Sequence, residues 1–253
     1  MTRAVLWGEI PAGFKTIRNG HGRMLLVRGD MEAELEMDKV TRQESPGSDS
    51  RLEGRGALGV LRLADGGEAL VRRYRHGGAL RALTGDCFFT WPPRPFRELA
   101  LTYEARRRGV RAAEPLAALV ETFAGPFYRG WLVTRRLADA RDFWALAQTE
   151  DFAAEKASWL RAAACAVRAM HRCGIHHRDL NLKNILLRRE ADGAVAYIID
   201  FDRSRLFTGP VPPARAERSL ARLNRSILKL DPARRFMTAA DWEFFLTAYR
   251  EAG

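Results

Sequence analysis

Short apolar runs with the spacing of β-strands dominate the first half of the chain. One run, MLLV at 24–27, predicts a strand, and GWLVTRRL at 130–137 predicts another. The segment 54–74 reads as two β-prone runs on either side of Asp65-Gly66-Gly67. Because glycine reaches positive φ angles without steric cost, these turn residues favour an antiparallel hairpin.

Helical spacing of apolar residues dominates the second half. The clearest pattern lies between Phe152 and His171, where apolar positions follow a period close to that of an α-helix, and Gly174 can end that helix in the left-handed conformation. Two short apolar strands, NILLRR and AVAYIIDF, follow on either side of Asp192-Gly193. Helices are expected over 96–108, 152–171, 217–230 and 239–251.

This order of elements predicts an α+β fold with two lobes. The first lobe is expected to be a small antiparallel β-sheet with one helix, and the second to be mainly helical. A polar, turn-rich stretch from Thr41 to Arg51 reads as a linker. The predicted divisions are an N-terminal arm and linker over 1–50, a first lobe over 51–136 and a second lobe over 137–253.

The chain carries a strong excess of positive charge, with 42 lysines and arginines against 31 aspartates and glutamates and a formal net charge of +11. Such a surplus favours phosphate-rich partners, namely nucleic acid, anionic lipid or a phosphorylated substrate. No stretch approaches the roughly 20 apolar residues of a membrane span, and the first residues lack the apolar stretch of a signal peptide, so a cytoplasmic protein is expected. The three cysteines form no CxxC pair, which argues against a disulfide framework or a thiolate zinc site.

The segment from His177 to Asn184, HRDLNLKN, matches the kinase catalytic-loop pattern H-R-D-L-x-x-x-N at every specified position. This chemistry requires a carboxylate, here Asp179, that orients an acceptor hydroxyl and takes its proton. It also requires an amide oxygen, from Asn184, that holds magnesium on the phosphates of ATP. A second metal ligand should be a carboxylate at the end of a buried strand, and Asp200 in YIIDFD fits that position after an intervening hairpin.

A glycine-rich segment, GRGALGV at 54–60, fits the pattern G-x-G-x-x-G-x-V. A dinucleotide site needs a strand before these glycines and a helix after them, whereas this chain has a polar linker before them and a β-hairpin after, as in a loop that covers ATP phosphates. No lysine occurs between Lys39 and Lys156, so Arg72 takes the place of the usual phosphate-binding lysine. The candidate nucleotide-binding residues are Gly54, Gly56, Gly59, Arg72 and, as the partner of Arg72 or else an incidental surface residue, Glu98.

These motifs resemble the protein-kinase-like fold and, more narrowly, the lipopolysaccharide core kinase family, most of all its 3-deoxy-D-manno-octulosonic acid (Kdo) kinases. The narrower resemblance spans approximately Gly54 to Lys229 and rests on VRRYRHGG, FRELALTYEARRRGV, HRDLNLKNILL and IIDFDRSR. It implies transfer of the γ-phosphate of ATP, with Mg²⁺, to the 4-hydroxyl of Kdo on a lipid A precursor. It also implies a peripheral place on the cytoplasmic face of the bacterial inner membrane, with the anionic membrane surface and no nucleic acid as a partner.

Departures from the protein-kinase pattern favour the narrower resemblance. Asp202 stands at the position of the DFG glycine, and Asn181 stands where protein kinases usually carry a catalytic-loop lysine. Lys183 is therefore a candidate catalytic residue that could lend positive charge to the transferred phosphoryl group, or it could face the surface. Asp202 could contact a metal or form a salt bridge with a nearby arginine.

Basic residues outside these motifs suggest further contacts with phosphate. A predicted amphipathic helix carries Arg218, Arg222, Arg225 and Lys229 opposite Leu220, Leu223, Ile227 and Leu230. Its basic side would either meet anionic lipid headgroups or be a solvated face. A second group could bind the phosphates of a lipid A acceptor, namely Arg72, Arg73, Arg75, His76, Arg81 and 106–108.

Two other classes of function fit parts of this pattern. One is a kinase for another acceptor, such as a core heptose, a small molecule or a protein serine. The other is a catalytically silent kinase-like scaffold that binds anionic lipid or RNA through its arginines. A zinc site is disfavoured, because no partner ligands at zinc-like spacing accompany His171, His176 and His177, for which a structural role is expected.

Overall fold

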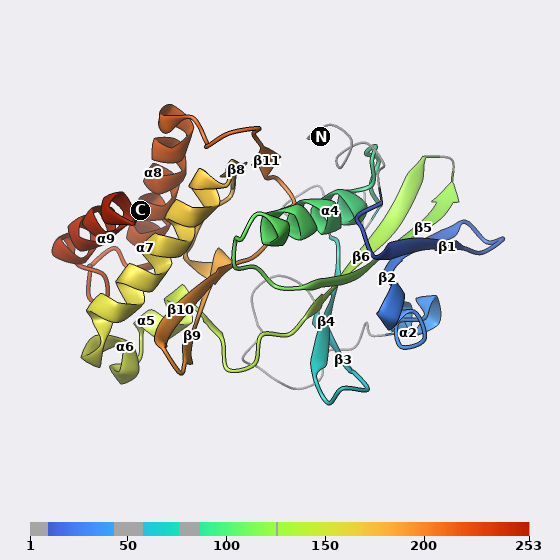
Figure 1. The fold of residues 1–253 in the computed structure, drawn as a ribbon, viewed down its shortest axis with the longest axis horizontal. Coiled ribbons are helices and arrows are strands. Elements are labelled where there is room, and N and C mark those ends of the chain that lie inside the picture. The colour runs from blue at the N-terminus through green and yellow to red at the C-terminus, as the bar shows by residue number, and fades with distance from the viewer. Residues whose placement is uncertain (1–9, 43–57, 76–86, 125, 253) are drawn as a thin grey trace. The chain divides into compact units, whose positions relative to one another are not determined.

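The computed structural model describes residues 10–42, 58–75, 87–124 and 126–252 (Figure 1). The chain divides into two compact units. The first, called the N-lobe below, comprises residues 1–103 and 114–136, and the second, the C-lobe, comprises 104–113 and 137–253. The predicted mixture of an antiparallel β-sheet and helices is confirmed.

The N-lobe is built on a six-stranded sheet in which every neighbouring pair of strands is antiparallel. In sheet order the strands are β1 (Phe14–Arg18), β2 (Arg23–Arg28), β5 (Pro115–Ala124), β6 (Phe127–Arg135), β4 (Glu68–Arg73) and β3 (Leu58–Arg62). The predicted hairpin is β3–β4, and Gly66 in its turn has φ +81°. The segment predicted as an N-terminal arm contributes β1 and β2 to this sheet, and β2 contains the predicted strand at 24–27.

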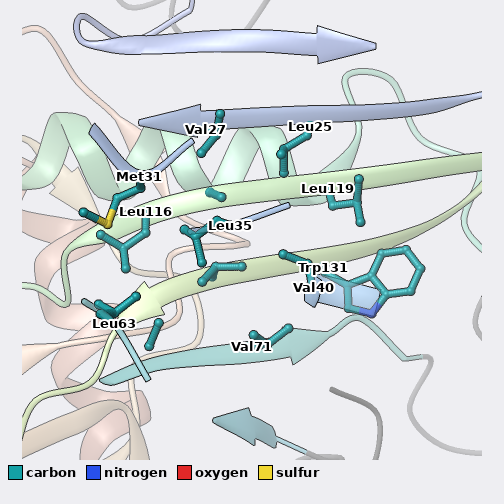
Figure 2. Close-up of a cluster of buried hydrophobic side chains, with 13 residues drawn as sticks. Leu25, Val27, Met31, Leu35, Val40, Leu63, Val71, Leu116, Leu119 and Trp131 are labelled. Carbon is teal, nitrogen blue, oxygen red and sulfur yellow. The ribbon is translucent and has the colours of Figure 1, made fainter. Parts of the chain in front are cut away.

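Two apolar clusters cover the two faces of the sheet. Figure 2 shows the first, which includes Leu25, Leu119 and Trp131 and is completed by the segment that contains η1 (Gly29–Met31) and α2 (Met37–Arg42). The second cluster lies on the other face and receives Leu99 from α4 (Arg94–Arg107). Side chains alternate between faces along a strand, so β4 sends Val71 into the first cluster and turns Arg72 toward the face that α4 covers.

The C-lobe is mainly helical, and its described residues also form two small antiparallel sheets, β10-β9-β7 and β11-β8. Its segments are β7 (Arg141–Asp142), α5 (Phe143–Ala147), α6 (Glu150–Ala154), α7 (Lys156–Arg172), β8 (Ile175–His176), η3 (Leu182–Asn184), β9 (Ile185–Glu190), β10 (Gly193–Ile198), β11 (Arg205–Leu206), α8 (Pro213–Leu230) and α9 (Ala239–Glu251). Helix α7 is the centre of the lobe and packs against α9 and β10. The aromatic stripe of α9 is buried at Trp242, Phe245 and Tyr249.

The chain leaves α7 at Gly174, a position that only glycine can occupy without strain. Its φ is +75°, and an added Cβ would lie 2.4 Å from the Gly209 carbonyl oxygen and 2.7 Å from that of Phe207. The Phe207 amide donates to the Gly174 carbonyl at 2.8 Å, which ties β8 and the catalytic-loop segment behind it to the chain around β11. This close packing directs the chain from the end of α7 into the segment with the catalytic-loop pattern, which begins at His177.

Two buried histidines in this region make stability depend on pH. Burial, and after it the neighbouring positive charges, lowers the pKa of His171 to about 3 and that of His176 to about 4. In the unfolded chain these two histidines take up protons near pH 6.5, whereas in the folded chain they do so only near pH 3 and pH 4. The unfolded chain therefore holds more protons than the folded chain between pH 6.5 and about 4. The free energy of unfolding should therefore fall as pH drops through this window, by about 2 kcal/mol per histidine at pH 5.

Urea unfolding of the parent and of a His171→Gln/His176→Gln variant at pH 5 and pH 7.5 measures this effect. The parent is expected to lose stability toward pH 5, and the variant to lose about 4 kcal/mol less, because glutamine does not titrate. Glutamine at 171 can still bond the Tyr249 hydroxyl, which lies 2.8 Å from His171 Nδ1. Equal pH dependence in the two proteins would show that these histidines are not the cause.

Candidate active site

The C-lobe brings Asn184 and Asp200 together through a β-hairpin. Strand β10 returns antiparallel along β9 with Ile198 opposite Ile185. The same register continues one residue further, where the Ile199 amide donates to the Asn184 carbonyl at 3.0 Å. Asp200, the next residue, is therefore delivered to the end of the catalytic loop, which spans residues 177–184.

His177 holds the loop to this hairpin. The Asp179 amide donates to His177 Nδ1 at 3.2 Å, so Nε2 carries the ring proton and donates to the Ile199 carbonyl at 3.0 Å. The imidazole is 1% exposed and lies 5.6 Å, centroid to centroid, from the ring of Phe201. His177 thus connects the segment that carries Asp179 to the segment that carries Asp200.

Two side-chain amides converge on the backbone of Asp179. Asn181 Nδ2 donates to the Asp179 carbonyl at 2.8 Å, and Asn184 Nδ2 donates to the same oxygen at 2.9 Å. Asn181 also accepts the backbone amide of Lys183 through Oδ1 at 3.0 Å. Asn181 therefore shapes the loop, and Lys183, the other candidate catalytic residue, is exposed.

The carboxylate of Asp179 contacts Arg222, which the sequence pattern places on the basic side of an amphipathic helix and not in the active site. Arg222 of α8 donates through Nη1 to Asp179 Oδ1 at 3.0 Å, whereas Arg222 belongs to the predicted basic stripe of that helix. Two serines of α8 also contact the loop. Ser226 accepts the Leu182 amide at 3.2 Å, and Ser219 donates to the His177 carbonyl at 3.4 Å. The only signal in the sequence is the helical spacing of these three positions.

Asp200 has an unusual backbone conformation. Its φ is +66°, a left-handed value that few residues other than glycine, asparagine and aspartate adopt. Such conformations cluster at functional sites because the surrounding structure must hold them in place. Asp202, two residues later, is buried at 5% exposure.

The donor atoms of this site suit magnesium. Carboxylate and amide oxygens are the hard ligands that Mg²⁺ prefers, together with phosphate oxygens. The Asn184 amide nitrogen is used by the Asp179 carbonyl, which assigns the amide oxygen to any metal. Within the described residues, no group of three or more His, Cys, Asp and Glu side chains is arranged to hold a metal ion.

The N-lobe joins Arg72 and Glu98. Arg72 of β4 donates to the Glu98 carboxylate on α4, and the Tyr74 hydroxyl donates to the same carboxylate oxygen. Glu98 is 2% exposed, and the Arg72 guanidinium lies 4.9 Å from the centroid of the Tyr74 ring. Of the predicted glycines, Gly59 lies buried in β3, one residue from the position that pairs with Arg72, while Gly54 and Gly56 lie outside the described residues.

Replacing Arg72 by glutamine is expected to lower the free energy of unfolding by about 3 kcal/mol, because the buried Glu98 would lose this cation. The double variant Arg72→Gln/Glu98→Gln should recover much of that loss, since a neutral amide pair needs no counter-charge. Urea unfolding measures both proteins. A single variant as stable as the parent, or a double variant less stable than the single one, would contradict this account of the pair.

The arginines proposed to bind acceptor phosphates have mixed surroundings. Arg73 places its guanidinium 5.5 Å from the Trp131 ring, whereas His76 and Arg81 lie outside the described residues. Arg108 donates through Nη1 to the carbonyls of Cys173 and Phe207, each at 2.8 Å. Arg107 and Arg108 also pair with Glu104, and Arg106 donates to the Ala112 carbonyl. Arg106 and Arg108 thus have structural bonds within the C-lobe, whereas Arg107 is half exposed beside Glu104.

Known proteins are similar to this chain over most of its length. The model of the lipopolysaccharide kinase (Kdo/WaaP) family matches residues 41–249. The 3-deoxy-D-manno-octulosonic acid kinase of Actinobacillus succinogenes is 34% identical over 206 residues, which cover 78% of this chain and 82% of that protein. The enzyme of the same name from Xanthomonas campestris strain B100 is 36% identical over 169 residues, 65% of this chain and 63% of that one.

A solved structure, WaaP in complex with acyl carrier protein, superimposes with a TM-score of 0.53 at 22% identity and covers 84% of this chain and 81% of that one. This likeness shows the fold, and the predicted kinase-like fold is confirmed. The family match and the relatives also confirm the predicted enzyme class, a kinase that transfers phosphate to a hydroxyl group. The chain belongs to the lipopolysaccharide kinase (Kdo/WaaP) family.

Proposed function

We propose that the chain transfers the γ-phosphoryl group of ATP to the 4-hydroxyl of Kdo on a lipid A precursor. The family match and relatives that are themselves Kdo kinases support the sugar. The observation that carries the chemistry is the catalytic loop, where the Asp179 backbone is held on both sides while its carboxylate is directed away from those contacts. A carboxylate presented in this way is suited to orient one hydroxyl.

The reaction follows from the roles of these groups. The acceptor hydroxyl donates a hydrogen bond to the Asp179 carboxylate, which orients its oxygen toward the γ-phosphorus and accepts its proton. A bond forms between that oxygen and the γ-phosphorus as the bond from the γ-phosphorus to the bridging β–γ oxygen breaks. ADP leaves with that oxygen, and the sugar gains a phosphate ester.

Magnesium would be held by the Asn184 amide oxygen and the Asp200 carboxylate together with phosphate oxygens. When bound, it supplies positive charge to phosphate oxygens and keeps the γ-phosphoryl group in line with the hydroxyl. Arg72, fixed by Glu98, is proposed to add a charge-assisted hydrogen bond to the phosphates of ATP. The glycine segment at 54–60 is proposed to cover those phosphates.

The decisive experiment incubates the protein with Mg-ATP and a panel of purified acceptors: a Kdo-bearing lipid A precursor, the same precursor without Kdo, a heptose-bearing core and a serine peptide. Mass spectrometry and NMR then locate any added phosphate. We expect phosphate on the Kdo 4-hydroxyl only, formed at least about 100-fold more slowly by an Asp179→Asn protein. Phosphate on heptose, on serine or on another hydroxyl of Kdo would contradict the proposal and identify a different acceptor group.

We also propose that the protein works at the cytoplasmic face of the inner membrane. Among the described residues, no helix has the length and apolarity that a bilayer crossing requires. An aromatic cluster in the N-lobe, defined by Phe89, Phe123 and Phe127, supports contact with this membrane. The rings of Phe89 and Phe127 lie 5.9 Å apart, those of Phe123 and Phe127 lie 6.5 Å apart, and all three are exposed.

A cation accompanies this aromatic cluster, because the Arg129 guanidinium lies 5.3 Å from the Phe123 ring. Exposed aromatic rings beside arginine suit the headgroup layer of an anionic bilayer. Sedimentation with vesicles of anionic and of zwitterionic lipid tests the contact. Alanine at all three positions should weaken binding to anionic vesicles about tenfold, whereas Leu228→Ala, a change at an exposed apolar residue of α8, should not. Unchanged binding by the triple variant would exclude this surface.

A further inference from the structure

Helix α8 is attached to the catalytic loop by one side of its surface. Ser219, Arg222 and Ser226 follow one another at spacings of three and four residues, so they lie on the same face of the helix. They contact His177, Asp179 and Leu182 of the loop at 3.4, 3.0 and 3.2 Å. The neighbouring Leu223 and Ile227 are buried and anchor the helix to the lobe.

Of these three contacts, only that of Arg222 reaches a functional group of the loop. The two serines bond to backbone atoms, whereas Arg222 bonds to the carboxylate proposed to act on the acceptor hydroxyl. Three other basic residues of α8 are exposed, and within the described part of the chain none of them forms an ion pair, namely Arg218, Arg225 and Lys229. Arg222 therefore differs from the rest of the predicted basic stripe.

Stability gives little reason for the Arg222–Asp179 pair. The side chains are 49% and 39% exposed, and ion pairs exposed to this extent contribute little to folding because solvent screens them. A fixed cation beside Asp179 has a larger effect on the reaction than on the fold. The loop position where protein kinases usually carry a lysine is occupied by Asn181, whose amide group is committed to loop contacts.

We propose that Arg222 is a positioning residue for phosphoryl transfer and supplies, from α8, a cation at the Asp179 carboxylate in place of the lysine that protein kinases usually carry at the position of Asn181. Its bond to Oδ1 holds the Asp179 carboxylate in one orientation and leaves Oδ2 as the oxygen that meets the acceptor hydroxyl. A guanidinium in this place also puts positive charge beside the oxygen that attacks the phosphoryl group. The inference rests on the proposed phosphoryl transfer but not on the identity of the sugar.

A positioning role for Arg222 fits the chemistry of phosphoryl transfer. Phosphoryl transfer has a loose transition state in which the metaphosphate-like group is highly electrophilic, so Asp179 accepts the hydroxyl proton late, as the new bond forms. Orientation of the hydroxyl and stabilisation of charge also lower the barrier. Arg222 serves both.

The test compares Arg222→Ala and Arg222→Lys with the control Arg225→Ala, an exposed arginine of the same helix. We expect Arg222→Ala to lower kcat about 30- to 100-fold with the KM for ATP within about threefold, since the residue acts on the loop carboxylate. Arg222→Lys should recover part of kcat, and added guanidinium ion should raise the kcat of Arg222→Ala but not that of the parent. Arg225→Ala should keep kcat within about twofold.

Each rate is measured both for transfer to the acceptor and for hydrolysis of ATP by water, so failure of the proposed acceptor leaves the result on Arg222 intact. Parental kcat in Arg222→Ala would overturn the proposal. A variant faster than the parent would overturn it too, because the pair would then be an inhibitory contact. If guanidinium did not rescue the loss of kcat, and Arg222→Ala also melted at a lower temperature than the parent, Arg222 would serve only to dock the helix.

Discussion

Replacing Asp179 by asparagine is expected to lower kcat by about 10²- to 10⁴-fold, the range that a positioned general base contributes. Asparagine has nearly the same shape and can still accept the hydrogen bond of Arg222 through Oδ1. It cannot take a proton from the acceptor hydroxyl. Steady-state rates of phosphoryl transfer under saturating Mg-ATP measure the loss.

The same variant should fold as the parent does. The loop is held through the backbone amide and carbonyl of Asp179, which bond to His177, Asn181 and Asn184, and these contacts do not involve its carboxylate. We therefore expect an unchanged melting temperature and an unchanged affinity for ATP. Retention of a tenth or more of the parental kcat would remove Asp179 from its proposed role, whereas a large fall in melting temperature would make the rate uninterpretable as chemistry.

Replacing Asp200 by asparagine should lower kcat by about 10³-fold and raise the Mg²⁺ concentration needed for half-maximal rate, because a neutral amide is a weaker ligand than a carboxylate. Asparagine is the informative choice, since it accepts the left-handed backbone that Asp200 adopts at φ +66°. Alanine would add a backbone cost of roughly 1–2 kcal/mol. Rates across a magnesium titration measure the effect.

Asp139 provides a matched control, because it is an exposed C-lobe aspartate with φ +57°. Asp139→Asn is expected to keep the parental rate and magnesium dependence. Asp139→Ala and Asp200→Ala should lose similar stability in urea. That shared loss measures the cost of placing alanine in the left-handed backbone conformation. If Asp200→Asn needed no more magnesium than the parent, Asp200 would not be a metal ligand.

The pairing of Asn184 with Asp200 could be predicted from the sequence because the contact is local. Two β-prone runs with Asp192-Gly193 between them make a hairpin, and antiparallel pairing brings the residues before and after the hairpin side by side. The likeness to kinase motifs adds the roles of these residues. The Arg72–Glu98 pair is also near-local, since alternation along β4 turns Arg72 toward the helix that follows.

Strand β5 is not evident in the sequence pattern. Its residues 115–124 carry no apolar–polar alternation, because apolar clusters cover both sides of this central strand, and Leu116 to Val120 are all nearly inaccessible. Such a run is ambiguous between a buried strand and a buried helix. The sheet neighbours β2 and β6 remove the ambiguity, since they offer the backbone partners that a strand needs.

Arg222 shows a second limit, which concerns side chains. On a helical wheel it is one of four equivalent cations, and periodicity predicts only that it faces away from the apolar side of α8. Its partner lies 43 positions earlier in the chain, and the contact depends on where α8 docks through Leu223 and Ile227. No local pattern specifies that docking.

The amino-acid order alone thus determined the β3–β4 and β9–β10 hairpins, the four long helices, the catalytic-loop pattern and the family, because each follows from short-range periodicity or from residue types at fixed spacing. Three-dimensional packing decided the place of the N-terminal strands in the sheet, the strand identity of 115–124, the structural use of Arg106 and Arg108 and the partner of Asp179. Each of these depends on contacts between segments far apart in the chain, and such contacts are selected by burial and hydrogen-bond completion across the whole lobe.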